Sequence, residues 1–501
     1  MKRHAQLAAI LLCFWVQSTG CGRSPATEAP QSFEEFRLLL ESRIESSLKK
    51  HRIPGAALAL VHEGAVVVER GFGVLRRGDA APVESSTVFQ VASVSKPVTA
   101  VAVLQLAEEG VLDLDEPVSS YLRRWRFPEA GLSSVAVTAR RLLSHTAGVS
   151  IHGYPGFPPE QPLPSLEDSL NGLTGGAGPV LVELSPGSSS SYSGGGYTVL
   201  QLLVEELTGQ SFASYMESRV LLPLGMNRSS YESPIAGAGL ATGHGWWGRV
   251  LPAYRFRAQA ASGLQATAGD LGRFLSGLEH PSRVGLSPGT RDQMLQSVEG
   301  LRRGFGLGFA LESWGAERIV LHTGANRGWR SIIAAAPERG EGIVVLTNSD
   351  RGLPLTTDAL CWWGQWLSGQ EPATCWAERK SRGTILAIAM LLGLGILMDG
   401  SGFVLGLLRG AGSRRRGRLE RYRWLNLSRL VLSVALLGLW WSFWYSDVIV
   451  VQMEGIENFT PVASLPPTFS WLTAAVTLWC VLSIARGLVG IRRFRSETAP
   501  L

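Results

Sequence analysis

Three long apolar stretches near the C-terminus divide this chain of 501 residues into two unlike parts. The stretches cover residues 383–408, 430–446 and 468–485. Each approaches or exceeds the roughly 17 to 25 residues that a helix needs to cross a bilayer. We therefore expect three transmembrane helices, preceded by a folded domain over residues 33–372.

The charged residues around these stretches predict how the chain crosses the membrane. Arginines crowd the loop 409–429 and return in the tail 486–501, whereas the loop 447–467 has acidic residues and no Lys or Arg. By the positive-inside rule, both basic segments lie in the cytoplasm and the acidic loop lies outside. The domain at 33–372 is then external, on a multi-pass membrane protein. The formal net charge of +6 reflects this topology, so we expect a lipid bilayer as partner and no nucleic acid.

Asp399 leaves an alternative topology open. A charged residue at the centre of a spanning helix costs about 3 kcal/mol on insertion scales. The sequence Asp399-Gly400-Ser401-Gly402 could instead break the first stretch into a re-entrant hairpin. Two crossings would then leave the C-terminus outside. A transport function would rest on Asp399 alone, and three spans are few for a transporter.

The N-terminus has the anatomy of a secretory signal. A basic start, an apolar run over residues 7–16 and small residues before Cys21 predict a signal peptide over residues 1–20 and a linker over 21–32. Cys21 is similar to a lipoprotein cleavage cysteine, although Ser18 stands where such sites usually have leucine. We expect export, with or without lipidation of Cys21.

The cysteines are consistent with an exported domain. Cys13 lies in the signal and Cys480 in the third apolar stretch. Besides Cys21, this leaves Cys361 and Cys375 as the only pair in the exported part. An oxidising compartment favours a disulfide between them, and two unpaired thiols are the alternative.

Ser93 and Lys96 point most directly to a chemistry. They stand three residues apart, just ahead of an apolar helical pattern that runs from Pro97 to Gly110. Residues i and i+3 are neighbours on a helix, so one helix face would carry both, and a neutral lysine could take the proton of the serine. Burial or a nearby cation would have to lower the pKa of Lys96 from about 10.4. Alternatively, Ser93 only caps the helix and Lys96 is solvated.

Two later segments extend this pair. Tyr192 lies in a loop rich in Ser and Gly before a helix over 198–207, and the His-Thr-Gly segment 322–324 ends one strand before another opens. In this order, the three elements resemble those of the serine beta-lactamase and penicillin-binding-protein family, in its class C-like branch, which also holds D-aminopeptidases and esterases. The resemblance runs from about residue 33 to residue 348. It includes residues 142–148, 223–226, 262–267, 304–308 and 345–348.

The resemblance implies a role for each of these residues. Ser93 is the acylated nucleophile, Lys96 its base or proton relay, and Tyr192 a second proton carrier. His322 replaces a lysine and would hold the substrate carboxylate or the tyrosine oxygen. The backbone N–H groups of Ser93 and Ala325 would form the oxyanion hole, in which removing one donor typically costs about 3 kcal/mol.

The resemblance also implies substrate contacts at Thr323, Gly324 and Gly194. Many relatives have an asparagine at the position of Gly194, where it contacts the substrate amide. Its absence puts a preference for beta-lactams or peptide amides in doubt.

Some of these residues have simpler interpretations. His145 resembles the family's internal packing and hydrogen-bonding histidine, and we expect a structural role for it. Tyr192 could be an ordinary loop aromatic, and His322 only a histidine at a strand end. Other chemistries have no support, because the chain contains no G-x-S-x-G, H-E-x-x-H, paired C-x-x-C or Walker sequence. We expect no metal and no cofactor.

The strand pattern predicts an α+β fold. Apolar runs at 56–60 and 65–68 flank a turn, helices dominate the middle, and strands return at 319–321, 331–336 and 343–347. This order fits an antiparallel sheet flanked by helices, with an inserted helical domain, as the family resemblance also implies.

Together these features predict an exported, membrane-anchored serine hydrolase that forms an acyl-enzyme. Its substrates would be D-amino-acid peptides of peptidoglycan, beta-lactams or small esters. The alternative is a penicillin-binding or wall-sensing receptor with little or no turnover. No recognisable signalling domain follows the spans, which weakens that alternative.

Overall fold

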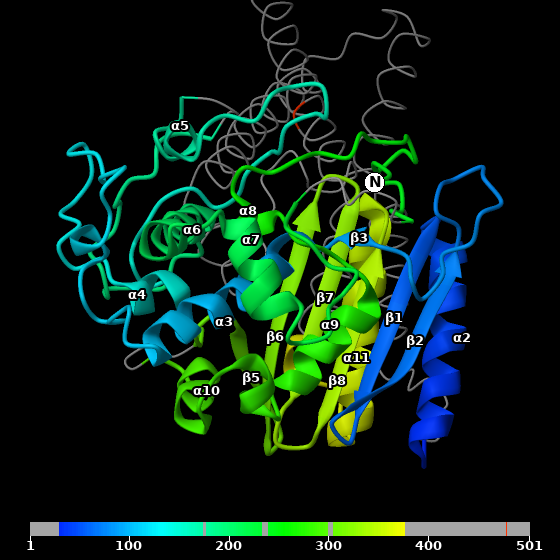
Figure 1. The fold of residues 1–501 in the computed structure, drawn as a ribbon. Coiled ribbons are helices and arrows are strands. Elements are labelled where there is room, and N and C mark those ends of the chain that lie inside the picture. The colour runs from blue at the N-terminus through cyan, green and yellow to red at the C-terminus, as the bar shows by residue number, and fades with distance from the viewer. Residues whose placement is uncertain (1–29, 174–176, 233–238, 299–303, 376–476, 478–501) are drawn as a thin grey trace, which may run out of the picture.

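The computed structural model describes residues 30–173, 177–232, 239–298, 304–375 and residue 477. Its centre is a six-stranded antiparallel sheet with strand order β2-β1-β8-β7-β6-β5 (Figure 1). The first strand and the last strand along the chain, β1 and β8, are paired with each other. The strands are β1 (Gly55–His62), β2 (Ala65–Gly73), β5 (Ala310–Trp314), β6 (Glu317–Asn326), β7 (Trp329–Ala336) and β8 (Glu341–Thr347).

Helices cover both faces of this sheet. The helices α2 (Phe33–His51) and α11 (Leu353–Ser368) pack on one face. The helix α9 (Ala268–Gly277) packs on the other face, in a core that also contains α3 (Ser95–Glu108). The sheet is therefore buried on both sides, which explains why β7 and β8 are buried along their whole length.

Strand β1 shows how the sequence divides between the two cores. Successive strand residues point to opposite faces. Leu58 and Leu60 enter the core under α2 and α11, while Ala57 and Ala59 enter the other core. The small side chains let α9 approach closely, since a Cβ added to Gly272 would lie 3.4 Å from Cβ of Ala59.

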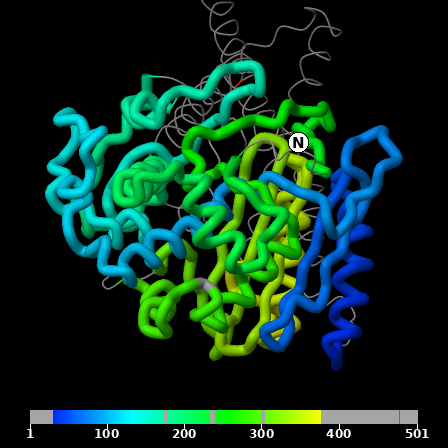
Figure 2. The backbone as a smooth tube through the Cα atoms, viewed as in Figure 1, coloured from blue at the N-terminus to red at the C-terminus, as the bar shows by residue number. Residues whose placement is uncertain are grey.

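The chain between β2 and β5 forms a mostly helical region beside and over the sheet (Figure 2). Its elements are β3 (Phe89–Gln90), η1 (Ala92–Val94), α3, η2 (Val118–Ser120), α4 (Ala139–Leu143), α5 (Leu166–Leu170), α6 (Gly194–Thr208), α7 (Phe212–Met216), η3 (Glu217–Leu221), α8 (Gln259–Ser262), β4 (Gln265–Ala266), α9, η4 (Pro281–Val284) and α10 (Pro288–Met294). After β8, η5 (Asp350–Gly352) leads into α11. The predicted α+β class, with an antiparallel sheet flanked by helices, is confirmed.

Two local features differ from the sequence prediction. The pattern did not reveal β5, a five-residue strand with three residues that are not fully buried. The helix expected at 198–207 begins earlier, at Gly194, because Ser193 caps it by accepting a hydrogen bond from the backbone N–H of Gly196 at 2.8 Å. Glycine disfavours helix by about 1 kcal/mol relative to alanine. Packing requires it here, since a Cβ added to Gly195 would lie 2.5 Å from the carbonyl oxygen of Ser150.

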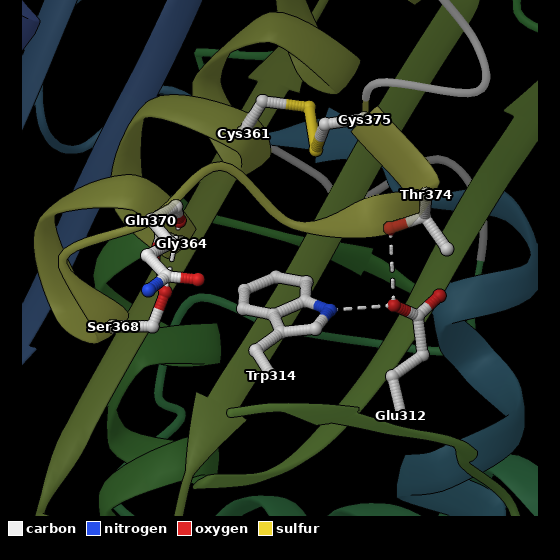
Figure 3. Close-up of a disulfide and its surroundings, with 8 residues drawn as sticks. All are labelled: Glu312, Trp314, Cys361, Gly364, Ser368, Gln370, Thr374 and Cys375. Carbon is white, nitrogen blue, oxygen red and sulfur yellow. Dashed lines mark hydrogen bonds between the residues drawn. A yellow bond between two sulfur atoms is a disulfide. The ribbon is translucent and has the colours of Figure 1, made fainter. Parts of the chain in front are cut away.

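A disulfide fastens α11 to the segment that follows it (Figure 3). Cys361 of α11 is bonded to Cys375, the pair for which we expected a disulfide, at a sequence separation of 14. Nearby, Nε1 of Trp314 donates to Oε2 of Glu312 at 2.6 Å, and Oγ1 of Thr374 donates to the same atom at 3.2 Å. These contacts tie the end of the described domain to the edge strand β5.

Several predictions fall outside the described residues. They concern the signal peptide 1–20, Cys21 and most of the linker 21–32, together with the C-terminal spans, loops and tail. The C-terminal predictions are those for residues 383–408, 409–429, 430–446, 447–467, 468–485 and 486–501. In the part of the chain that the structure describes, no helix combines the length and the apolar character needed to cross a bilayer.

Candidate active site

Ser93 and Lys96 lie side by side where the chain turns from β3 into α3. Ser93 belongs to the 3₁₀ turn η1, and α3 begins only at Ser95, so the prediction that one face of an α-helix carries both residues is wrong in this detail. Ala92 has a φ of 52°, a left-handed conformation that bends the chain just before the serine. Since a 3₁₀ turn contains three residues, the two side chains remain neighbours. Nζ of Lys96 donates to Oγ of Ser93 at 3.2 Å.

Lys96 is buried to an unusual degree for a lysine. Only 1% of its surface is exposed, and its Nζ also donates to the carbonyl oxygen of Ala261 at 2.8 Å. Burial lowers the pKa of Lys96 to about 7. A sizeable fraction of this lysine is therefore neutral near neutral pH, which is what a base for Ser93 requires.

The end of β6 forms the wall opposite the serine turn. β5 pairs with β6 only from Glu317 to Leu321, so no described strand flanks residues 322–326 on that side. They lie against η1 instead. Gly324 permits this contact, because a Cβ added there would lie 2.2 Å from the carbonyl oxygen of Val91. Oγ of Ser331 on β7 donates to the same oxygen at 2.8 Å and secures the turn.

Three predicted site residues lie along this edge of β6. Thr323 and Ala325 are partly exposed, whereas Gly324 between them is buried. Ala325, the proposed second oxyanion donor, directly follows the glycine that touches the serine-bearing segment. The geometry thus brings Ser93 and residues 323–325 to one place, as the resemblance implies.

His322 lies on the same edge and is a neutral hydrogen-bond acceptor. Its Nδ1 is 2.7 Å from the carbonyl oxygen of Thr323, so Nδ1 carries the proton and Nε2 is left to accept. Burial, and secondly the charge of Lys96, lowers the pKa of His322 to about 3. Two roles were considered for His322, a cation for a substrate carboxylate and a partner of the tyrosine oxygen, and a neutral ring suits only the second.

Tyr192 lies between Lys96 and three histidines. Nζ of Lys96 is 4.8 Å from the centre of the tyrosine ring. The ring centres of His145, His152 and His322 lie 4.4, 4.8 and 6.1 Å from that of Tyr192. The segment 188–193 therefore presents its tyrosine to the serine–lysine pair.

His145 holds this tyrosine in position. Its Nδ1 accepts a hydrogen bond from the backbone N–H of Ser193 at 3.1 Å. Burial, and then the charge of Lys96, keeps the pKa of His145 well below its usual value of 6.5. A neutral ring is needed for this acceptor role. This hydrogen bond agrees with the structural role expected for His145, although the sequence did not reveal that its partner is Ser193, 48 positions later.

Gly194 occupies a crowded position beside the tyrosine. A Cβ added there would lie 3.0 Å from the carbonyl oxygen of His152 and 3.5 Å from that of Ile151. The segment 151–153 thus fills the space that a larger residue at position 194 would need. The packing therefore explains why no asparagine stands at position 194. The polar side chain near this position is that of His152.

A cavity of about 240 Å³ adjoins the catalytic segment. Gln90, which lies three residues before Ser93, lines this cavity. So does Ser262, which follows the residue whose carbonyl oxygen binds Lys96. Nδ2 of Asn326 lies 3.4 Å from both Oε1 of Gln90 and the carbonyl oxygen of Ser262, and so links the cavity to the end of β6. The full lining is Gln90, Leu163, Tyr231, Glu232, Tyr254, Arg255, Phe256, Gln259, Ser262, Gly263 and Gln265.

The residues near the site offer no evident metal ligand set. Among the described residues, no three His, Cys, Asp or Glu side chains gather in a way that could hold a metal ion. The histidines around Tyr192 are hydrogen-bonded to backbone groups or packed at an angle against the tyrosine ring. The chemistry of the site is that of a serine beside a buried amine.

An antiparallel sheet covered by helices, with a serine–lysine pair and a tyrosine facing the edge of β6, defines the beta-lactamase and transpeptidase type of fold. The beta-lactamase family model matches residues 40–360, and the chain belongs to this family.

Similar proteins support this assignment. The chain is 30% identical to penicillin-binding protein 4 of Amycolatopsis lactamdurans over 342 residues, which cover 64% of this chain and 87% of that protein. It is 26% identical to the protein flp of Staphylococcus aureus over 62% of each chain. Among solved structures, it is similar to the octameric penicillin-binding protein homologue from Pyrococcus abyssi, with a TM-score of 0.57, 26% identity and coverage of 67% of this chain and 78% of that chain. The structure of SurE with D-Leu gives a TM-score of 0.52 at 28% identity, with 65% and 74% coverage.

Proposed function

We propose that this protein is a serine hydrolase that acts through an acyl-enzyme on Ser93. Neutral Lys96 takes the proton of Ser93 as Oγ attacks the substrate carbonyl carbon. The backbone N–H groups of Ser93 and Ala325 stabilise the oxyanion. Lys96 then passes this proton through the hydroxyl of Tyr192 to the leaving group, and the neutral ring of His322 lies beside that tyrosine, with 6.1 Å between the ring centres. Water then attacks the acyl-serine carbonyl, and Ser93 regains its proton as the acid is released.

The observation that carries this proposal is the contact of 3.2 Å between Lys96 and Ser93, combined with the burial of the lysine. A solvated lysine would be protonated at neutral pH and could not act as a base. Burial without a carboxylate partner is costly for a lysine that serves only structure. The presence of such a lysine beside a serine supports a catalytic role.

The site gives some guidance on substrates. D-amino-acid peptides, beta-lactams and small esters share a carbonyl that a serine can attack. Gly194 offers no side chain to a substrate amide, and neutral His322 offers no charge to a carboxylate. These features favour small esters over the other two classes. The cavity lined by Gln90 and Ser262 would receive the acyl group.

We also propose that the protein is exported and anchored in the bacterial cell membrane, with this domain outside. The support is the sequence: the signal-like N-terminus, three apolar stretches and arginines confined to alternate loops. The disulfide in the domain agrees with an oxidising compartment.

The main alternative is a receptor that is acylated but barely turns over. The names of the relatives include penicillin-binding proteins. The surroundings of Ser93 are neutral and poor in carboxylates. If no group there activated the water needed for deacylation, the acylated protein would persist, as such a receptor requires. Labelling and turnover must therefore be measured separately.

The test is incubation of the full chain with a fluorescent penicillin and with a chromogenic ester. Ser93→Ala should abolish both labelling and hydrolysis, while Ser133→Ala, at an exposed serine away from the site, should leave both unchanged. Acylation that persists in Ser93→Ala would refute the proposed nucleophile. Stoichiometric labelling of the wild type without turnover of either compound would favour the receptor.

A further inference from the structure

A cluster of arginines surrounds one exposed loop at the end of the sheet where β1 begins and β8 ends. The loop covers residues 244–250 and contains two adjacent tryptophans. The arginines come from three other connections as well as from the loop itself. This arginine patch consists of Arg52, Arg76, Arg77, Arg249 and Arg351.

Direct contacts hold the patch together. The backbone N–H of Arg77 donates to Nε2 of His244 at 3.0 Å, and Nε of Arg351 donates to the carbonyl oxygen of Trp246. The guanidinium of Arg77 also lies on the backbone of the loop, since a Cβ added to Gly248 would lie 1.8 Å from its Nη1. The loop and the arginines are thus one surface.

The charge of this patch is not neutralised from within the domain. Among the described residues, no ion pair joins any of its five arginines to a carboxylate, whereas Arg124 and Arg140 elsewhere both have such pairs. Asp350, next to Arg351 in the chain, is bound by Arg330 at 2.9 Å. Asp79 is exposed in the same turn as Arg76 and Arg77 and is the one acidic residue there.

The arginines lie close enough to act on one another. Burial, and then the charges of Arg52 and Arg77, lower the pKa of Arg351. Burial lowers the pKa of His244 too, with smaller effects from Arg77 and Arg76. Like charges gathered without a counter-charge are unfavourable in the isolated domain and favour an anionic partner.

Trp247 identifies the kind of partner. It is 70% exposed and stands among the arginines at the tip of the loop, and Val250 beside it is 37% exposed. Tryptophan is enriched where one side of a protein meets the headgroup region of a bilayer, because its ring is apolar and its N–H is polar. Arginines around an exposed tryptophan suit a planar surface that is anionic outside and apolar beneath.

We propose that the arginine patch and Trp247 dock this domain on an anionic phospholipid surface. Trp247 enters the headgroup region, and the arginines contact lipid phosphates. The loop also packs against the β6–β7 turn, where a Cβ added to Gly328 would lie 2.9 Å from the backbone nitrogen of His244. Docking therefore brings the end of β6 that lies at the candidate active site towards the membrane, and it orients the domain. This docking does not depend on the hydrolase reaction.

The test is hydrogen–deuterium exchange of the full chain reconstituted in nanodiscs. The two compositions are phosphatidylcholine alone and phosphatidylcholine mixed with phosphatidylglycerol. We expect slower exchange at residues 244–250 and 74–79 in the anionic nanodiscs, with the difference removed at high salt. Since each arginine near an anionic surface strengthens binding about fivefold, Arg76→Glu/Arg77→Glu should weaken the protection by at least about twentyfold. Trp247→Ala should reduce it in part.

The matched control is Arg123→Glu/Arg126→Glu, the same change of charge at exposed arginines of the cyan segment on the far side of the molecule from β1 and β2 (Figure 1). It should keep full protection, and all variants should hydrolyse a small soluble ester at the wild-type rate. Equal exchange in the two lipid compositions, or equal protection in the Arg76/Arg77 and Arg123/Arg126 variants, would overturn the proposal. Equivalent protection by glycerol phosphate in neutral nanodiscs would also overturn it, by showing a site for soluble anions.

Discussion

Gly324 lies so close to Val91 that no side chain fits between them. A Cβ added to Gly324 would lie 2.2 Å from the carbonyl oxygen of Val91 and the same distance from Oγ of Ser331. The open edge of β6 can therefore approach the segment that carries Ser93. This contact sets the distance between the nucleophile and the strand that supplies the second oxyanion donor.

Gly324→Ala should consequently impair catalysis more than folding. The added methyl group must push β6 and the serine turn apart, and a displacement of about 1 Å in an active site can lower the rate about 100-fold. Overpacking of this kind usually costs about 1–3 kcal/mol of stability. The measurements are ester turnover and the urea midpoint of the full chain. Gly178→Ala is the matched control, because a Cβ there meets nothing within 4 Å. Wild-type turnover in Gly324→Ala would show that the close approach does not matter.

Lys96→Met should abolish acylation and yet stabilise the protein. The folded-state pKa of Lys96 is about 7, against about 10.5 for a lysine in water, so its burial costs about 5 kcal/mol of stability below pH 7. Methionine removes that cost, although it leaves the carbonyl of Ala261 without this donor, a loss of about 1–3 kcal/mol.

The sign of the pH dependence follows from the lowered pKa of Lys96. Between about pH 7 and 10 the unfolded chain binds more protons at this lysine than the folded one, so wild-type stability rises with pH. The advantage of Lys96→Met should be greatest below pH 7 and should shrink towards pH 10. Ester turnover by the wild type should rise with pH through about 7, as Lys96 loses its proton. If the stability difference between Lys96→Met and the wild type did not change with pH, burial would not lower the pKa of Lys96.

The sequence predicted the contacts that depend on local spacing. Ser93 and Lys96 are three residues apart, and any helical turn makes such residues neighbours. Their predicted contact is therefore present although the turn is 3₁₀. The apolar runs likewise predicted β1, β7 and β8. The short strand β5 lacked such a run, and only its pairing with β6 reveals it.

The properties that depend on distant residues could not be predicted. The carbonyl that binds Lys96 belongs to Ala261, 165 positions later in the chain. The neutrality of His322 comes from its burial and from the charge of Lys96, which no local pattern reports. For the same reason, the sequence left two roles open for His322, and the neutral state of its ring suits one of them.

His322→Gln and His322→Ala should differ in effect. A glutamine keeps a neutral oxygen acceptor near the position of Nε2, so we expect ester turnover within about tenfold of the wild type, whereas alanine should lose about 100-fold or more. Both variants should still be labelled slowly at Ser93 by a reactive penicillin. Because the pKa of His322 is about 3, its titration should not contribute to the pH–rate profile. The profiles of the wild type and of His322→Gln should therefore show the same inflections. Loss of labelling as complete as in Ser93→Ala would show that His322 acts on the nucleophile itself.

Removal of the disulfide should lower stability without changing the chemistry. Cys361 and Cys375 close a loop of about 15 residues, for which chain entropy gives about 3 kcal/mol of stabilisation. Cys361 belongs to α11, on the sheet face opposite to the core that contains Val91 and Val94 around Ser93. Cys361→Ser/Cys375→Ser should therefore keep the kcat and KM for the ester and unfold at a lower urea concentration. The reduced wild type should unfold at the midpoint of the double variant. A reduced wild type with the midpoint of the oxidised protein, or two free thiols found by mass spectrometry of the unreduced chain, would contradict this prediction.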